Sequence, residues 1–261
     1  MFLTLERAIK KIEQDRSRGE LKKAKERALD ALKKWPDSFE LAVIAVNCCI
    51  ESGDSAQATS ILKGMLRQHP SKKKAILELA DSAYRTTFNP IIGSFLIELL
   101  IRSKEIETVE NILRRSSDEF ISDLIRRSET RAEGLKQQGS SQAIFENNIL
   151  LALLYIESQK EDNAIAPLLE VLKSPSTDLE MVGNLLVKIE QIHPENPLVK
   201  YALGLVSIKL NRPRKALPRL FQSLKHKDAP VEEILEAVEG INDNIPELKL
   251  CLLYTSPSPR D

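Results

Sequence analysis

The side chains that could support acid–base or metal chemistry are few in this 261-residue sequence, and they are scattered. The three histidines are His69, His193 and His226, and two of them directly precede a proline where a helix is expected to end. None of them belongs to a His-Glu-x-x-His motif or to another motif with the ligand spacing of a zinc site. We therefore predict that the histidines are turn residues, and we expect no metal and no cofactor.

The other residue types that support catalysis are placed as structural residues would be. No two of the nine glycines stand at the G-x-G spacing of a phosphate loop, and no Gly-x-Ser-x-Gly elbow occurs. The acid pairs Asp118-Glu119 and Glu232-Glu233 fall at expected helix starts, where carboxylates interact favourably with the helix dipole. The sequence therefore predicts no enzymatic activity within these residues.

The cysteines and the apolar segments bear on where the protein resides. Cys48 and Cys49 are adjacent, so a disulfide between them would be strained, and we predict two buried free thiols. Glu6 interrupts the opening segment before the apolar core of a signal peptide could form. The longest apolar stretch, residues 91–101, is too short to span a membrane. We expect a cytoplasmic protein without a membrane span.

The charge balance bears on the class of partner. Lysine plus arginine and aspartate plus glutamate number 38 each, so no global field draws the chain to nucleic acid or to an anionic membrane. Basic clusters occur in segments 21–35, 71–74 and 211–220; acids interleave with the first cluster and aliphatic residues with the last, as on a solvated helix face. A protein or peptide partner is therefore expected and no nucleic acid. If a basic cluster binds a partner, an acidic peptide is favoured over RNA, because aromatic residues that could stack on bases are few.

The elements that must position these residues are helices. Apolar residues recur at three- and four-residue spacing along the chain, with glycine, asparagine or proline between the segments and no alternating strand pattern. Three kinds of landmark recur after 34 residues: Gly19 with Gly53, Ala24 with Ala58, and Pro36 with Pro70. The glycine can end a first helix in the left-handed conformation, the alanine allows close helix packing, and the proline stops the second helix. The period therefore predicts a repeated helix–turn–helix.

This pattern resembles the tetratricopeptide repeat (TPR), and segments 147–175 and 193–225 carry it again, with Ala164 and Ala216 on their second helices. The Leu203-Gly204 pair of a TPR first helix is also present. The resemblance implies an all-α, right-handed superhelix of TPR-like helical repeats, with an irregular centre. It also implies a non-catalytic interaction scaffold that binds a partner peptide in a concave groove.

The register of the repeats is interrupted. Ala164 and Ala216 lie about one and a half periods apart, so an extra helix is expected over residues 178–192. Residues 75–115 have helical periodicity without a turn glycine or an alanine in phase. The segment "QQGSSQ" (137–142) is the best candidate for a hinge between two lobes, 1–138 and 142–250. A single curved solenoid is the alternative.

The resemblance also supplies candidate contacts for a partner. The positions that face the groove in TPR first helices correspond here to Glu13, Glu40, Asn47, Lys74, Glu157, Tyr201 and Lys209. Some TPR domains bind an acidic chaperone terminus through a carboxylate clamp, whose positions correspond to Ile9, Glu13, Ile44, Lys74 and Glu78. Only Lys74 matches the clamp, so that function is disfavoured.

Two other functions remain open from the sequence. The chain could be the N-terminal repeat region of a larger enzyme, such as a transferase or peptidase, whose catalytic domain follows the repeats. It could also bind RNA as a pentatricopeptide-like array, although its neutral charge speaks against that function.

The last eleven residues, Cys251–Asp261, resemble a translated transposon-end sequencing adapter and are set aside as a non-native tail. The preceding segment ends at Leu250 in what reads as the start of another helix. We therefore expect the chain to be a fragment.

Overall fold

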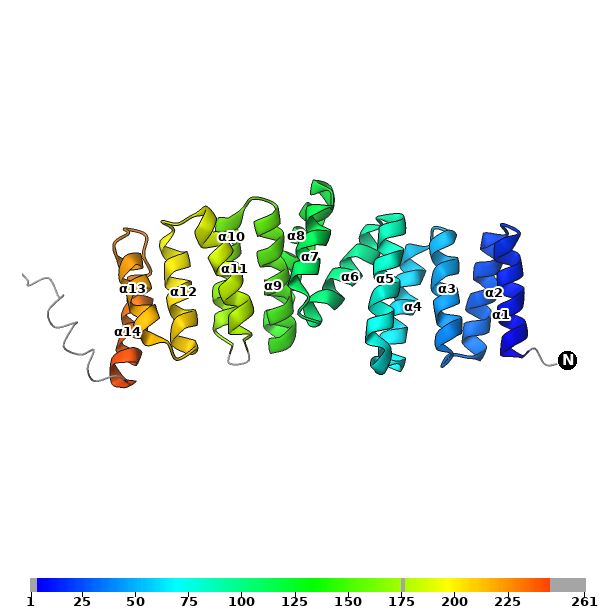
Figure 1. Ribbon diagram of the computed structural model, residues 1–261, viewed down its shortest axis with the longest axis horizontal. Coiled ribbons are helices and arrows are strands. Elements are labelled where there is room, and N and C mark those ends of the chain that lie inside the picture. The colour runs from blue at the N-terminus through cyan, green and yellow to red at the C-terminus, as the bar shows by residue number, and fades with distance from the viewer. Residues whose placement is uncertain (1–3, 175–176, 245–261) are drawn as a thin grey trace, which may run out of the picture. The chain divides into compact units, whose positions relative to one another are not determined.

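The computed structural model describes residues 4–174 and 177–244, which form α-helices without a β-strand (Figure 1). The prediction of an all-α helical-repeat fold is confirmed. The adapter-like tail at 251–261 lies outside the described residues, so its origin stays a prediction.

The chain divides into two compact units, residues 1–112 and 113–261. The helices of the first unit are α1 (Leu5–Ser17), α2 (Leu21–Lys34), α3 (Phe39–Glu51), α4 (Ser55–Gln68), the short 3₁₀ helix η1 (Pro70–Lys72), α5 (Lys73–Thr87) and α6 (Pro90–Arg102). The division falls inside α7 (Ile106–Arg114). The second unit continues with α8 (Asp118–Gln138), α9 (Ser141–Glu157), α10 (Glu161–Leu172), α11 (Leu179–Ile192), α12 (Pro197–Lys209), α13 (Pro213–Leu224) and α14 (Val231–Asn244).

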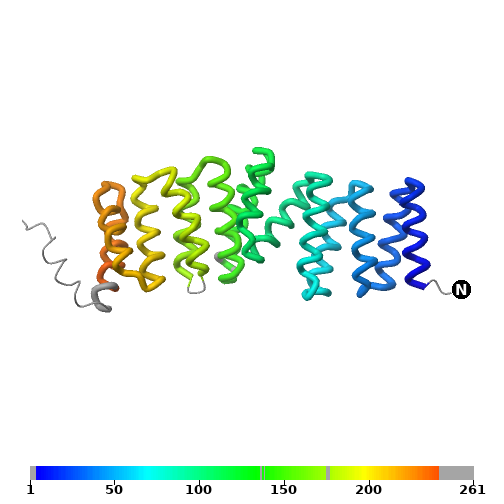
Figure 2. The backbone as a smooth tube through the Cα atoms, viewed as in Figure 1, coloured from blue at the N-terminus to red at the C-terminus, as the bar shows by residue number. Residues whose placement is uncertain are grey.

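The first unit is a two-layer array in which each helix packs on the next, from α1 to α6 (Figure 2). Helix α3 also packs on α1 and on α5, so α1, α3 and α5 form one layer. Helix α4 packs on α6 in the other layer. The first helices of successive pairs therefore lie side by side.

The turns inside the α1–α2 pair and the α3–α4 pair have the geometry that the sequence predicts. Gly19 and Gly53 adopt left-handed φ values of 76° and 79°. The amide of Glu20 donates to the Asp15 carbonyl at 2.9 Å, and the amide of Asp54 donates to the Cys49 carbonyl at 2.8 Å. These bonds satisfy carbonyls at the helix end that would otherwise lack partners. Five residues after each glycine, Ala24 and Ala58 are fully buried.

The irregular centre contains the same turn with different residues. Lys104 has a left-handed φ of 61°, and the Glu105 amide donates to the Leu100 carbonyl at 3.0 Å. Val109, five residues after Lys104, is fully buried where the other turns have alanine. The sequence lacks a glycine and an alanine here, yet the backbone forms the repeat turn between α6 and α7.

The second unit uses the turn twice more. Gln159 and Asn211 have φ values of 57° and 56° and end α9 and α12. The alanines that follow them, Ala164 and Ala216, are fully buried. Gly204 on α12 lies so close to α13 that a Cβ atom there would be 2.5 Å from Leu220 Cδ2.

Helix α11 confirms the predicted extra helix, and it shifts the array by half a repeat. Helix α9 packs on α11 in one layer, whereas α12 packs on α10 and on α14 in the other. The first helix of the α9–α10 pair and the first helix of the α12–α13 pair therefore lie in different layers. One helix inserted between two pairs produces this exchange.

The predicted hinge lies at the turn between α8 and α9, inside the second unit. Gly139 caps α8 with a φ of 68°, and α8 packs directly on α9. The Asn147 side-chain amide donates to the Ser128 carbonyl at 2.9 Å across this pair. The lobes 1–138 and 142–250 stay a prediction, since the compact units divide near Ile112.

Candidate functional site

Four of the predicted partner-binding residues come from three first helices of one layer. Glu13 lies on α1, Glu40 and Asn47 lie on α3, and Lys74 lies on α5. Because the repeat is 34 residues long, Asn47 holds the position that Glu13 holds one pair earlier, and Lys74 holds that of Glu40. We call these four residues the first-helix face.

The side chains of the first-helix face are not used to build the fold. Glu13, Glu40 and Lys74 are exposed and Asn47 is half-buried. None of the four side chains makes a hydrogen bond or an ion pair with another residue in the part of the chain that the structure describes, although the Glu13 carboxylate interacts electrostatically with Arg16 and helps to raise its pKa. They are therefore available to an outside partner.

The 34-residue register also identifies residues that the prediction omitted. Glu6 is exposed on α1, one repeat before Glu40, and Asp81 lies on α5, one repeat after Asn47. Asp81 Oδ2 pairs with Arg85 Nε at 2.8 Å, one turn later on the same helix. Extending the period in both directions would have found both acids.

Ion pairs link successive repeats of the first unit. Arg16 Nε on α1 donates to Glu51 Oε2 on α3 at 2.9 Å. Lys25 Nζ on α2 lies 3.1 Å from Asp54 Oδ2 at the start of α4. The pKa of Asp54 is lowered first by the hydrogen bond from the Gln57 backbone amide and then by Lys25. The Arg16–Glu51 pair thus joins α1 and α3, the helices that carry Glu13 and Asn47.

The three predicted residues of the second unit lie in different surroundings. Glu157 at the end of α9 is mostly buried, with 12% of its side chain exposed, and its Oε1 lies 3.4 Å from Arg114 Nε. Tyr201 on α12 packs against the cluster of Ala216, Leu220, Ile234 and Val238, and burial raises its pKa. Lys209 is exposed. Since α9 and α12 belong to different layers, the structure separates Glu157 from the other two.

Two of the histidines lie at helix ends, as predicted. His69 follows α4 and contacts the Phe39 ring edge-on, with the ring centroids 5.5 Å apart. His193 follows α11, and its Nε2 lies 3.6 Å from Glu161 Oε2. Among the described residues, no group of three or more His, Cys, Asp or Glu side chains could hold a metal ion.

Cys48 and Cys49 are free and buried, as predicted. Burial raises the pKa of the Cys48 thiol to about 11 and that of the Cys49 thiol to about 12. Thiols with such pKa values are neutral at physiological pH, so they are poor nucleophiles.

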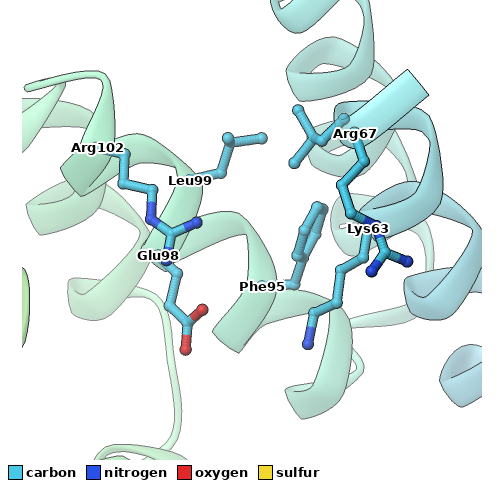
Figure 3. A pocket seen from close by; sticks show the side chains of 7 residues that line it. Lys63, Arg67, Phe95, Glu98, Leu99 and Arg102 are labelled. Carbon is cyan, nitrogen blue, oxygen red and sulfur yellow. The ribbon is translucent and has the colours of Figure 1, made fainter. Parts of the chain in front are cut away.

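A groove of about 330 Å³ lies between α4 and α6, in the second-helix layer of the first unit (Figure 3). We call it the α4–α6 groove, and it is lined by Lys63, Leu66, Arg67, Phe95, Glu98, Leu99 and Arg102. In Figure 3, Lys63 and Arg67 lie on the α4 side, and Phe95 stands between them and Glu98. The sequence prediction did not include this surface.

The clamp positions offer little to a carboxylate. Ile44 is 8% exposed and Ile9 is half-buried, and neither side chain can donate a hydrogen bond. Glu13 and Glu78 are exposed acids that would repel a carboxylate.

Within 4–174 and 177–244, no helix combines the length and apolar character that crossing a membrane requires.

No protein-family model and no curated protein matches the chain. Among solved structures, the crystal structure of the P58(IPK) TPR domain is similar, with 14% sequence identity and a TM-score of 0.35. The match covers 93% of this chain and 66% of that chain, so this chain spans just under two thirds of the solved structure.

Proposed function

We propose that the chain is a non-catalytic protein-interaction scaffold whose first unit binds an extended or helical segment of a partner protein on the first-helix face. The observation that carries this proposal is the set of equivalent residues on α1, α3 and α5 that the fold does not use. Repeat proteins bind partners on such surfaces because each repeat adds one copy of the same contact position.

Binding would combine apolar and charged contacts. Ile9, Val43 and Leu77 occupy one repeat position on α1, α3 and α5, and all three are half-buried. A partner segment could cover their remaining apolar surface, which supplies affinity. Glu13, Glu40 and Lys74 would then select the partner and its register, because charge complementarity contributes mainly to specificity.

The test is a pull-down with the full chain, with mass spectrometry of the proteins retained, followed by binding measurements with the purified partner. The variant Glu13→Ala/Asn47→Ala/Lys74→Ala should weaken binding about tenfold or more, because it removes one polar contact from each of three helices. The matched control is Glu26→Ala/Lys22→Ala/Lys34→Ala, three exposed residues on α2. Equal binding by the folded first-helix variant and the wild type would contradict the proposal.

A further inference from the structure

The α4–α6 groove lies in the opposite layer from the first-helix face and plays no part in the function proposed above. Its α4 side carries two cations one helical turn apart, Lys63 and Arg67. Like charges at this spacing destabilise an isolated helix by about 0.2–0.5 kcal/mol. Neither cation makes an ion pair with any acid in the described part of the chain. The α4 rim is therefore a pair of exposed positive charges beside a cavity.

The base of the groove is apolar. Phe95 and Leu99 on α6 are 6% and 4% exposed, and half-buried Leu66 lies on α4 between the two cations. Leu66 is three residues after Lys63 and one before Arg67, so the three side chains share one side of α4. An apolar side chain that entered the groove would thus contact carbon atoms, and the adjacent residues of the same partner would contact Lys63 and Arg67.

The α6 rim has a different charge pattern. Glu98 and Arg102 lie four residues apart with the acid first, which is the favourable order for opposite charges on a helix. Glu98 would repel a carboxylate on this side. The α4 rim carries two cations, whereas the α6 rim carries one acid and one cation, so a carboxylate is favoured along α4 over α6.

We propose that the α4–α6 groove binds a peptide segment that carries an apolar side chain next to a carboxylate. The carboxylate lies between Lys63 and Arg67, and the apolar side chain lies over Leu66, Phe95 and Leu99. The volume is near the lower end of the range for ligand pockets, about 300–1,000 Å³, and suits one or two side chains of a peptide. The lining of the groove contains a single aromatic ring, whereas RNA binding generally uses several rings on which successive bases stack, so a peptide is favoured over RNA.

The test uses the full chain and three fluorescent synthetic peptides. One alternates glutamate with leucine, the second replaces each leucine with serine, and the third replaces each glutamate with lysine. Fluorescence anisotropy should show binding of the first peptide that weakens with added salt, and weaker binding of the second. The variant Lys63→Glu/Arg67→Glu should lose about tenfold or more in affinity for the first peptide and gain affinity for the third.

The matched control is Lys22→Glu/Lys34→Glu, which makes the same charge change at two exposed positions on α2 and should bind the first peptide as the wild type does. Hydrogen exchange on the wild-type chain provides a second readout that needs no variant, with slower exchange expected in α4 and α6. Three results would overturn the proposal: no binding of the first peptide, equal loss in the control, or a single-stranded RNA that binds more tightly through Lys63 and Arg67. The first-helix variant should bind the first peptide normally, so this site and the proposed function fail independently.

Discussion

At the scale of single residues, Gly204 shows how the helix spacing depends on the absence of one side chain. A Cβ atom at this position would lie 2.5 Å from Leu220 Cδ2 and 2.9 Å from Leu220 Cγ. Leu220 lies on α13 and is fully buried in a cluster with Ala216, Ile234 and Val238, so it has little room to move. The close approach of α12 and α13 therefore requires glycine.

Gly204→Ala should lower the free energy of unfolding by about 1–3 kcal/mol, the usual cost of overpacking a core. The matched control is Gly64→Ala on α4, where an added Cβ would meet no atom within 4 Å. That change should raise the free energy of unfolding by about 0.5–1 kcal/mol, because alanine is the better helix former. Urea denaturation of both variants measures the two effects, and a stabilised Gly204→Ala would contradict the packing argument.

The pKa values of Cys48 and Cys49 predict how stability changes at high pH. Burial raises both thiol pKa values from 9.0, to about 11 and about 12, so the folded state keeps its protons after the unfolded state has lost them. This contribution to stability is fully present below pH 9 and falls as pH rises towards 12. The variant Cys48→Ala/Cys49→Ala should show a shallower fall in the free energy of unfolding between these pH values. If the free energy of unfolding falls equally steeply with pH in the wild type and the variant, the two thiols do not make this contribution.

At the scale of elements, the same left-handed turn ends several helices although a different residue type can hold its positive-φ position. Within the described residues, glycine, lysine, glutamine and asparagine all adopt φ values between 56° and 79° at five helix ends that close this way. The amide of the next residue bonds back to a carbonyl of the preceding helix in each case, at 2.8–3.0 Å. A residue other than glycine has a conformational cost in this left-handed region.

Gln159→Gly should therefore raise the free energy of unfolding by about 0.5–1 kcal/mol, because glycine adopts a positive φ without strain. The reverse exchange, Gly53→Gln, should lower it by about 1 kcal/mol. Thermal denaturation followed by circular dichroism compares the pair. A destabilised Gln159→Gly would mean that the glutamine side chain contributes more than its backbone strain costs.

The sequence predicts the helices and the clearest repeats because the residues that mark them, turn glycines and closely packed alanines, each favour one local structure. Gly19, Gly53 and the buried alanines are of this kind, and the interrupted register predicts α11. The turn at Lys104 could not be predicted, since lysine has no preference for a positive φ and Val109 differs from alanine. The α4–α6 groove was missed because Lys63 and Arg67 read as ordinary surface charges until α6 is placed beside α4.

At the scale of the whole molecule, a helical array transmits instability only through neighbouring helices. Helix α12 contacts α10, α11, α13 and α14, all within the second unit. Gly204→Ala should therefore speed hydrogen exchange in these helices and leave the amides of α1–α4 unchanged. Mass spectrometry of exchanged peptides resolves the two regions, and equal acceleration in both would show that the chain unfolds as one cooperative block.

The extra helix α11 changes the layer in which the later first helix of the second unit lies. An insertion of two helices keeps every later first helix on its original side, whereas an insertion of one moves it to the other side. Two pairs with the same sequence landmarks can therefore have their first helices in different layers, as α9 and α12 do. The number of helices between two repeats, odd or even, decides whether a contact residue identified on one repeat has a counterpart on the same surface of the next.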